Sequence, residues 1–89
     1  MNMGFTIEQS TAKRESSGIY WYYIYKDRHL IARYWHDHRG DEHGIEFTNG
    51  AVESCPVGRM IEFIEGGGPH PLGLTARAVA YLEAQLRGC

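Results

Sequence analysis

Charge of one sign, cysteines and long apolar runs are all scarce in this chain of 89 residues. Nine Lys and Arg against eleven Asp and Glu leave a formal charge of −2, which argues against broad electrostatic binding of nucleic acid or an anionic membrane. No segment could span a bilayer, and the N-terminus lacks the basic and apolar regions of a signal peptide. The two cysteines, Cys55 and Cys89, follow no zinc or redox spacing. These absences predict a cytoplasmic protein without a membrane partner.

The length and composition predict one globular domain spanning residues 1–89. A chain this short has room for a single core, and 43% hydrophobic with 22% charged residues is the composition of a folded protein. Glycine and proline cluster at residues 66–71, which predicts a loop over residues 66–73. We therefore expect a strand-rich part over residues 4–54 and a helical part over residues 55–88.

Aromatic residues are abundant and unevenly placed. Seven of the eleven lie between Tyr20 and Trp35, and residues 19–25, all aromatic or β-branched, give the strongest strand signal. Residues 5–9 and 29–37 also have strand character. The strands are separated by turn signals at Asp27-Arg28, Gly40-Asp41 and Asn49-Gly50. The front of the chain therefore predicts an antiparallel β-meander of four to five strands.

Two helices are predicted after the meander. Ser54 and Pro56 favour a helix start, and an apolar face then continues as far as Gly66 through Val57, Met60, Ile61 and Ile64. Thr75 is a favourable N-cap for a second helix, and Leu74 precedes it. The apolar stripe of this helix comprises Val79, Leu82 and Leu86. Strands followed by helices predict an α+β fold, with both α-helices packed on one face of the sheet.

The two faces of the sheet can be assigned if each turn contains two residues, because opposed residues in an antiparallel pair share a face. Tyr25 then opposes Leu30, and His38 opposes His43. One face gathers the expected core: Ile19, Trp21, Tyr23, Tyr25, Leu30, Ala32, Tyr34, Ile45, Phe47 and Val52. The other face carries Tyr20, Tyr22, Ile24, Ile31, Arg33, Trp35, Glu46, Thr48 and Glu53. A bulge or a three-residue loop would exchange the faces of everything beyond it.

The second face has the composition of a binding surface. Aromatic residues and Arg are enriched at protein–protein hot spots, and Arg33 can stack on Tyr22 or Trp35. We therefore predict a non-enzymatic protein–protein interaction module whose partner-binding residues are Tyr20, Tyr22, Ile24, Ile31, Arg33 and Trp35. The partner is either a second copy, in a homodimer, or a larger bacterial or phage complex that the chain regulates or inhibits. The alternative is that these aromatic pairs only stabilise the sheet.

Two other functions stay open at the level of sequence. His36, His38 and His43 would meet at the end of the sheet, and imidazoles suit zinc or another divalent metal. A solvated turn rich in His, Asp and Glu explains the same residues without a metal, and in that case we expect no cofactor. Single-stranded nucleic acid could stack on the aromatic residues, although the balance of charge favours a protein partner.

Overall fold

The computed structural model describes residues 4–10, 19–37, 39, 42–54, 56–67 and 70–87. Within these residues the fold is α+β, with a five-stranded antiparallel sheet, a two-stranded antiparallel sheet and one α-helix. The large sheet follows chain order: β1 (Phe5–Gln9), β2 (Tyr20–Lys26), β3 (His29–His36), β4 (His43–Phe47) and β5 (Val52–Ser54). The predicted antiparallel meander is confirmed.

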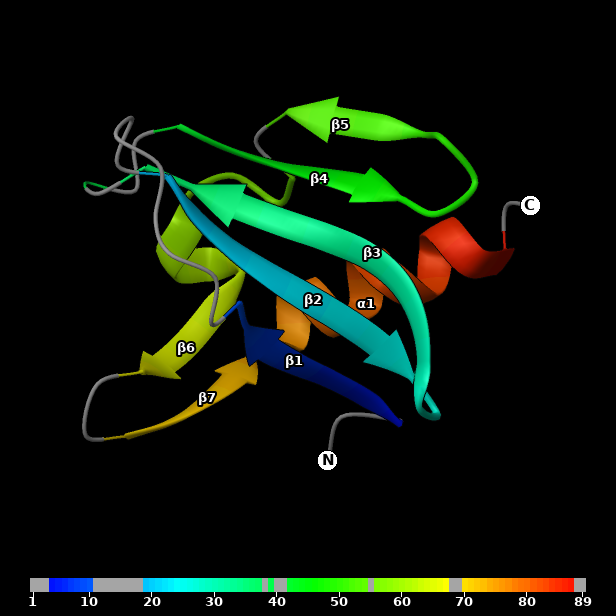
Figure 1. Ribbon diagram of the computed structural model, residues 1–89, viewed down its shortest axis with the longest axis horizontal. Coiled ribbons are helices and arrows are strands. Elements are labelled where there is room, and N and C mark those ends of the chain that lie inside the picture. Colours follow the sequence, from blue (N-terminus) through cyan, green and yellow to red (C-terminus); the bar gives the residue numbers. More distant parts are fainter. Residues whose placement is uncertain are drawn as a thin grey trace.

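The region after β5 differs from the sequence-based expectation of a helix starting near Ser54. It contains one short 3-10 turn and a hairpin: η1 (Met60–Glu62), β6 (Ile64–Gly67) and β7 (His70–Leu74). Val57 and Gly58 have φ angles of 53° and 93°, outside the right-handed region that a helix requires. The predicted first helix is therefore wrong, and most of the predicted loop over residues 66–73 is the hairpin, which lies beside β1 (Figure 1).

The predicted C-terminal helix is confirmed as α1 (Ala76–Arg87). The Thr75 hydroxyl accepts a hydrogen bond from the amide of Ala78 at 3.1 Å, which is the expected N-cap contact. The same hydroxyl donates to the carbonyl of Glu62 at 2.6 Å, so the cap also attaches the helix to η1. Figure 1 shows α1 behind the large sheet, where it covers one face.

The buried face of the large sheet is only partly the predicted one. Ala32, Tyr34 and Ile45 are buried as expected, but Tyr22 and Ile24, which were predicted to face outward, are also buried. Core residues from outside the large sheet include Phe63, whose ring stacks on Tyr34 with centroids 4.3 Å apart, and Ile64, Leu74, Ala78, Val79 and Leu82.

A β-bulge explains the exchanged faces of β2. Tyr25 opposes Leu30 as predicted, but the next residue, Ile24, opposes Ala32, so Ile31 is an extra residue in β3. One extra residue reverses the side-chain alternation of everything beyond it. The predicted inward positions of Trp21, Tyr23 and Tyr25 are therefore wrong, and Leu30, also predicted in the core, is 43% exposed.

Two later connections also differ from two-residue turns. His36 opposes His43, so the predicted pairing of His43 with His38 is wrong, and His38 lies outside the described residues. The Gly50 amide donates to the carbonyl of Phe47 and Gly50 has a φ of 97°, which is the geometry of a three-residue loop with a bulge. As a result Val52, predicted in the core, is 68% exposed.

Candidate functional site: an aromatic sheet face and two pockets

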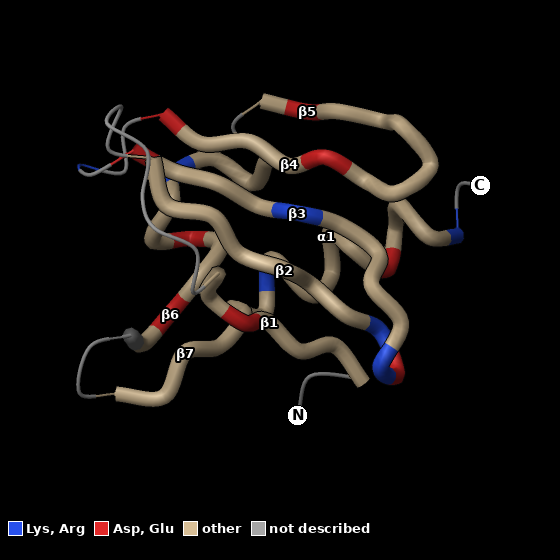
Figure 2. Tube along the Cα trace, viewed as in Figure 1, with Lys and Arg blue, Asp and Glu red and all other residues tan. Residues whose placement is uncertain are grey.

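Trp21, Tyr23, Tyr25, Arg33 and Trp35 lie on the outer face of the large sheet, and we call them the aromatic face. All of them except Tyr25 belong to two adjacent cross-strand rows: Glu8, Tyr23, Arg33, Glu46 and Val52, then Trp21, Trp35, Gly44 and Ser54. Among the described elements, α1 lies on the opposite side of the sheet (Figure 1). Figure 2 shows few charged positions along the middle of β2 and β3.

Arg33 is at the centre of the aromatic face. Its guanidinium carbon lies 4.6 Å from the centroid of the Trp21 ring, close enough for a cation–π contact. Its Nη2 donates to a carboxylate oxygen of Glu46 at 2.6 Å, and both side chains are well exposed, by 49% and 37%. An exposed ion pair of this kind contributes little to folding stability. The ion pair instead matters for the surface, because it places a positive and a negative charge side by side on β3 and β4.

Trp35 lies flat on the sheet because its neighbour on β4 has no side chain. A Cβ added to Gly44 would be 2.6 Å from Nε1 of Trp35, so any other residue would displace the indole. Gly44 opposes Trp35 in the register, and glycine inside a strand often marks such a close approach. The glycine was the available sequence signal for a flat aromatic surface at this position.

The six residues predicted to bind a partner are divided by the fold. Arg33 and Trp35 lie on the aromatic face. Tyr22 and Ile24 are buried, while Tyr20 and Ile31 are half-buried and packed against the core. Trp21, Tyr23 and Tyr25 were not among the predicted partner-binding residues. The segment from Tyr20 to Tyr25 is aromatic or β-branched at every position and so shows no alternation that could reveal the bulge.

Two tyrosine–histidine pairs occupy the opposite, inner face. The Tyr22 hydroxyl lies 2.8 Å from Nε2 of His36, and the Tyr34 hydroxyl lies 3.0 Å from Nδ1 of His43. The other nitrogen of each ring lies at hydrogen-bond distance from a backbone carbonyl, that of Asp37 for His36 and that of Gly58 for His43. A carbonyl only accepts, so that nitrogen carries the proton, and in the neutral ring the remaining nitrogen accepts from the tyrosine.

These contacts bear on the predicted metal site at His36, His38 and His43. Both ring nitrogens of His36 and of His43 already have protein partners, so either ring could bind a metal only by giving up a hydrogen bond. No cluster of three or more His, Cys, Asp or Glu suited to a metal ion occurs among the described residues, which exclude His38. The roles of the two described histidines are therefore explained by packing and hydrogen bonding.

A pocket of about 550 Å³ lies where the Tyr22–His36 pair meets the β6–β7 hairpin. The Tyr20 and His36 rings stack with centroids 5.2 Å apart, and the His36 and Tyr22 rings stack at 5.3 Å. Burial, with a smaller contribution from nearby Tyr20, raises the pKa of the Tyr22 phenol. The phenol therefore stays neutral and able to donate well into alkaline solution. The pocket is lined by Gln9, Tyr20, Tyr22, His36, Met60, Ile61, Ile64, Glu65, Gly66 and Leu72.

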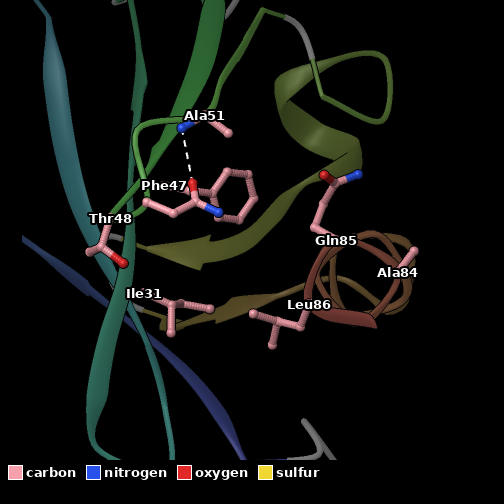
Figure 3. A pocket seen from close by; sticks show the side chains of 8 residues that line it. Ile31, Phe47, Thr48, Ala51, Ala84, Gln85 and Leu86 are labelled. Carbon is pink, nitrogen blue, oxygen red and sulfur yellow. Dashed lines mark hydrogen bonds between the residues drawn. The ribbon is translucent and has the colours of Figure 1, made fainter. Parts of the chain in front are cut away.

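A second pocket, of about 320 Å³, separates the large sheet from the C-terminal turn of α1. Figure 3 shows Ile31 from β3 and Leu86 from α1 pointing toward each other across it. The Asn49 side chain at its rim accepts a hydrogen bond from the amide of Ala51 at 2.9 Å. The bulge turns Ile31 toward the helix, where it forms one wall of this pocket. The described lining is largely apolar and contains no charged side chain.

Comparison with known protein families, with curated proteins and with solved structures found no match to this chain. Among the described residues, no helix has the length and apolar character needed to cross a membrane.

Proposed function

We propose that this chain is a non-enzymatic interaction protein that binds a second copy of itself through the aromatic face. The observation that carries the proposal is the cluster of Trp21, Tyr23, Arg33 and Trp35 on the side of the sheet away from α1. Trp, Tyr and Arg are the residues most enriched at interaction hot spots. A flat sheet face of this composition can pack against another sheet at about 10 Å.

The arrangement of charge favours a second copy as the partner. Arg33 and Glu46 oppose each other on neighbouring strands, so the face carries a positive and a negative charge side by side. A two-fold axis that runs parallel to the strands between β3 and β4 places Arg33 of each copy over Glu46 of the other. An isologous interface requires such self-complementarity. An axis perpendicular to the strands would instead bring the two arginines together.

The same axis also places apolar groups in complementary positions. Tyr23 of one copy lies over Val52 of the other, because both belong to the row that contains Arg33 and Glu46. Val52 is 68% exposed in the single chain, and a second copy would remove it from water. Each Trp35 indole covers Gly44 of its own chain, so the same axis would bring the two indoles toward each other.

The size of the face predicts a reversible dimer. Five strands about 4.8 Å apart and about five residues long, at about 3.4 Å each, give a face of roughly 20 × 17 Å. A standard specific interface buries about 800 Å² per partner, and transient ones bury less. We therefore expect monomer and dimer to exchange, with a dimer fraction that rises with protein concentration.

Charge reversal and mixing test the proposal. Arg33→Glu leaves two acidic residues at the axis and Glu46→Arg leaves two basic ones, so each variant should dimerise at least about tenfold more weakly than the wild type. An equimolar mixture of the two variants should dimerise again, because each acidic pair then faces a basic pair. Sedimentation velocity over a concentration series gives the dissociation constants. Circular dichroism checks that each variant is folded.

Mixing separates the proposed contact from the ion pair within one chain. The loss of the internal Arg33–Glu46 contact is the same in the mixture as in each variant alone, so only a contact between copies explains recovery. Arg87→Glu, the same change on exposed α1, is the matched control and should leave dimerisation unchanged. A wild type that sediments as a monomer at every concentration, or a mixture that stays monomeric, would overturn the proposal.

A further inference from the structure

The pocket beside Tyr22 and His36 combines an apolar wall with an acidic rim. Met60, Ile61, Ile64 and Leu72 form the apolar wall on η1 and the β6–β7 hairpin. Ile61 is 59% exposed, and a large apolar side chain exposed at the mouth of a pocket is typical of a ligand site. Glu65 belongs to the same lining, and its side chain extends over Gly73, which opposes it in the hairpin.

Two polar groups of this pocket, the Tyr22 hydroxyl and the Glu65 carboxylate, can accept hydrogen bonds from a positively charged ligand. Because the Tyr22 hydroxyl donates to His36, its oxygen keeps a lone pair that can accept from a ligand. Glu65 adds a carboxylate, and the described lining contains no Lys or Arg. The stacked rings of Tyr20 and His36 present aromatic surface, and the negative face of a tyrosine ring attracts cations.

We propose that this pocket binds a small organic cation with an apolar body, in the class of arylalkylamines and alkylamines. The ammonium group would lie between the Glu65 carboxylate and the Tyr22 oxygen, with the apolar body against Ile61 and Leu72. The pocket lies on the inner side of the large sheet and shares no residue with the aromatic face. The inference is therefore independent of dimerisation and can hold in a monomer.

Three probes of similar size and different charge test the inference. Phenethylamine is the proposed type of ligand, 3-phenylpropionate reverses the charge, and 2-phenylethanol has no charge. Titration of the ¹⁵N-labelled full chain, followed by amide NMR shifts, gives both affinity and location. We expect the amine to bind at least about tenfold more tightly than the carboxylate, with the largest shifts in β6, η1 and the start of β2.

Variants identify the two halves of the site. Glu65→Gln should weaken amine binding about fivefold and leave the binding of 2-phenylethanol unchanged, as expected for one exposed ion pair. Ile61→Ser should weaken both probes, because it removes apolar contact area from a residue that is already mostly exposed and so spares the fold. Glu8→Gln removes the same charge from neighbouring β1 on the outer face and is the matched control.

Several outcomes would overturn the inference. Equal binding of all three probes would mean that the pocket recognises only apolar surface. An equal loss of affinity in Glu8→Gln and Glu65→Gln would mean that general electrostatic attraction is responsible. Amine-induced shifts confined to residues outside β6, η1 and β2 would place the cation elsewhere. Failure of this test leaves the sedimentation result for the aromatic face unaffected, so the two proposals stand or fall separately.

Discussion

At the residue scale, two glycines with similar φ angles have different surroundings. Gly66 has a φ of 81°, and an added Cβ would collide with the carbonyl of Pro71 across the hairpin. Gly50 has a φ of 97°, but an added Cβ would meet nothing within 4 Å. At position 66 glycine is required both by the positive φ angle and by the lack of room for a Cβ. At position 50 it is required by the positive φ angle alone.

Alanine substitutions at these glycines should separate the two requirements. Gly50→Ala should lower the free energy of unfolding by about 1–2 kcal/mol, the cost of a left-handed conformation for a residue with a Cβ. Gly66→Ala should cost a further 1–3 kcal/mol or so from the steric clash. Urea denaturation of the two variants and the wild type measures both changes. Equal losses would show that the hairpin opens to accommodate the methyl group.

A tyrosine links stability to alkaline pH. Burial and a hydrogen bond of 2.7 Å from the Tyr81 hydroxyl to the Glu53 carboxylate raise the pKa of Tyr81. In the unfolded chain a tyrosine loses its proton near pH 10. Above that pH the unfolded state therefore binds fewer protons than the folded state, and the free energy of unfolding falls as the pH rises.

Substitution of Tyr81 by Phe should reduce this alkaline sensitivity. At pH 7 the variant should lose about 1 kcal/mol with the hydrogen bond to Glu53. Between pH 10 and roughly 11.5 its stability should decline less steeply than that of the wild type, because one titrating phenol has been removed. Urea denaturation at several pH values measures both slopes. Parallel declines would exclude Tyr81 as a source of the pH dependence.

At the scale of elements, the sequence predicts the strands of the large sheet and the C-terminal helix well but predicts the faces of that sheet poorly. The β-rich composition of residues 19–25 and the Thr75 cap are local signals, and both elements form. No residue type in β3 encodes the bulge at Ile31. Because β2 is aromatic or β-branched from Tyr20 to Tyr25, its composition fits either face. Three of the five residues of the aromatic face were therefore predicted to lie in the core.

The predicted first helix failed for a different reason. Met60, Ile61 and Ile64 have helical spacing, but Val57 and Gly58 adopt positive φ angles, and Ile64 pairs with Leu74 in the hairpin. A short apolar run cannot be assigned to helix or strand by its period alone. The glycines that follow were interpreted as a loop, although Gly66 is the residue that lets β6 bulge.

The Thr75 hydroxyl should contribute measurably to the stability of α1. Thr75→Ala removes both the hydrogen bond from the Ala78 amide and the one to the Glu62 carbonyl, and should lower the free energy of unfolding by about 1–2 kcal/mol. Thr75→Ser keeps the hydroxyl and should cost less than about 0.5 kcal/mol. Urea denaturation monitored by circular dichroism at 222 nm compares the two. A similar loss in both variants would assign the effect to the methyl group instead.

At the scale of the whole molecule, the two faces of the large sheet have different roles. The inner face packs against α1, η1 and the hairpin, and its polar groups are paired with one another or with backbone carbonyls. The aromatic residues of the outer face do not pack against those elements, and the exposed Arg33–Glu46 ion pair lies near their centre. A chain with a single small core gains only a small free energy of folding from its own packing. Association through the outer face would add stability that depends on concentration.

The thermal stability of the wild type should therefore depend on protein concentration. When the dimer is populated, a tenfold increase in concentration adds about 1.4 kcal/mol per dimer to the free energy of unfolding. For two chains of this length that corresponds to a rise in Tm of about 3–4 °C. Differential scanning calorimetry over a hundredfold range measures the change, and the monomeric Arg33→Glu variant should show no shift. If the Tm of the wild type is constant over that range, the protein does not dimerise through the aromatic face.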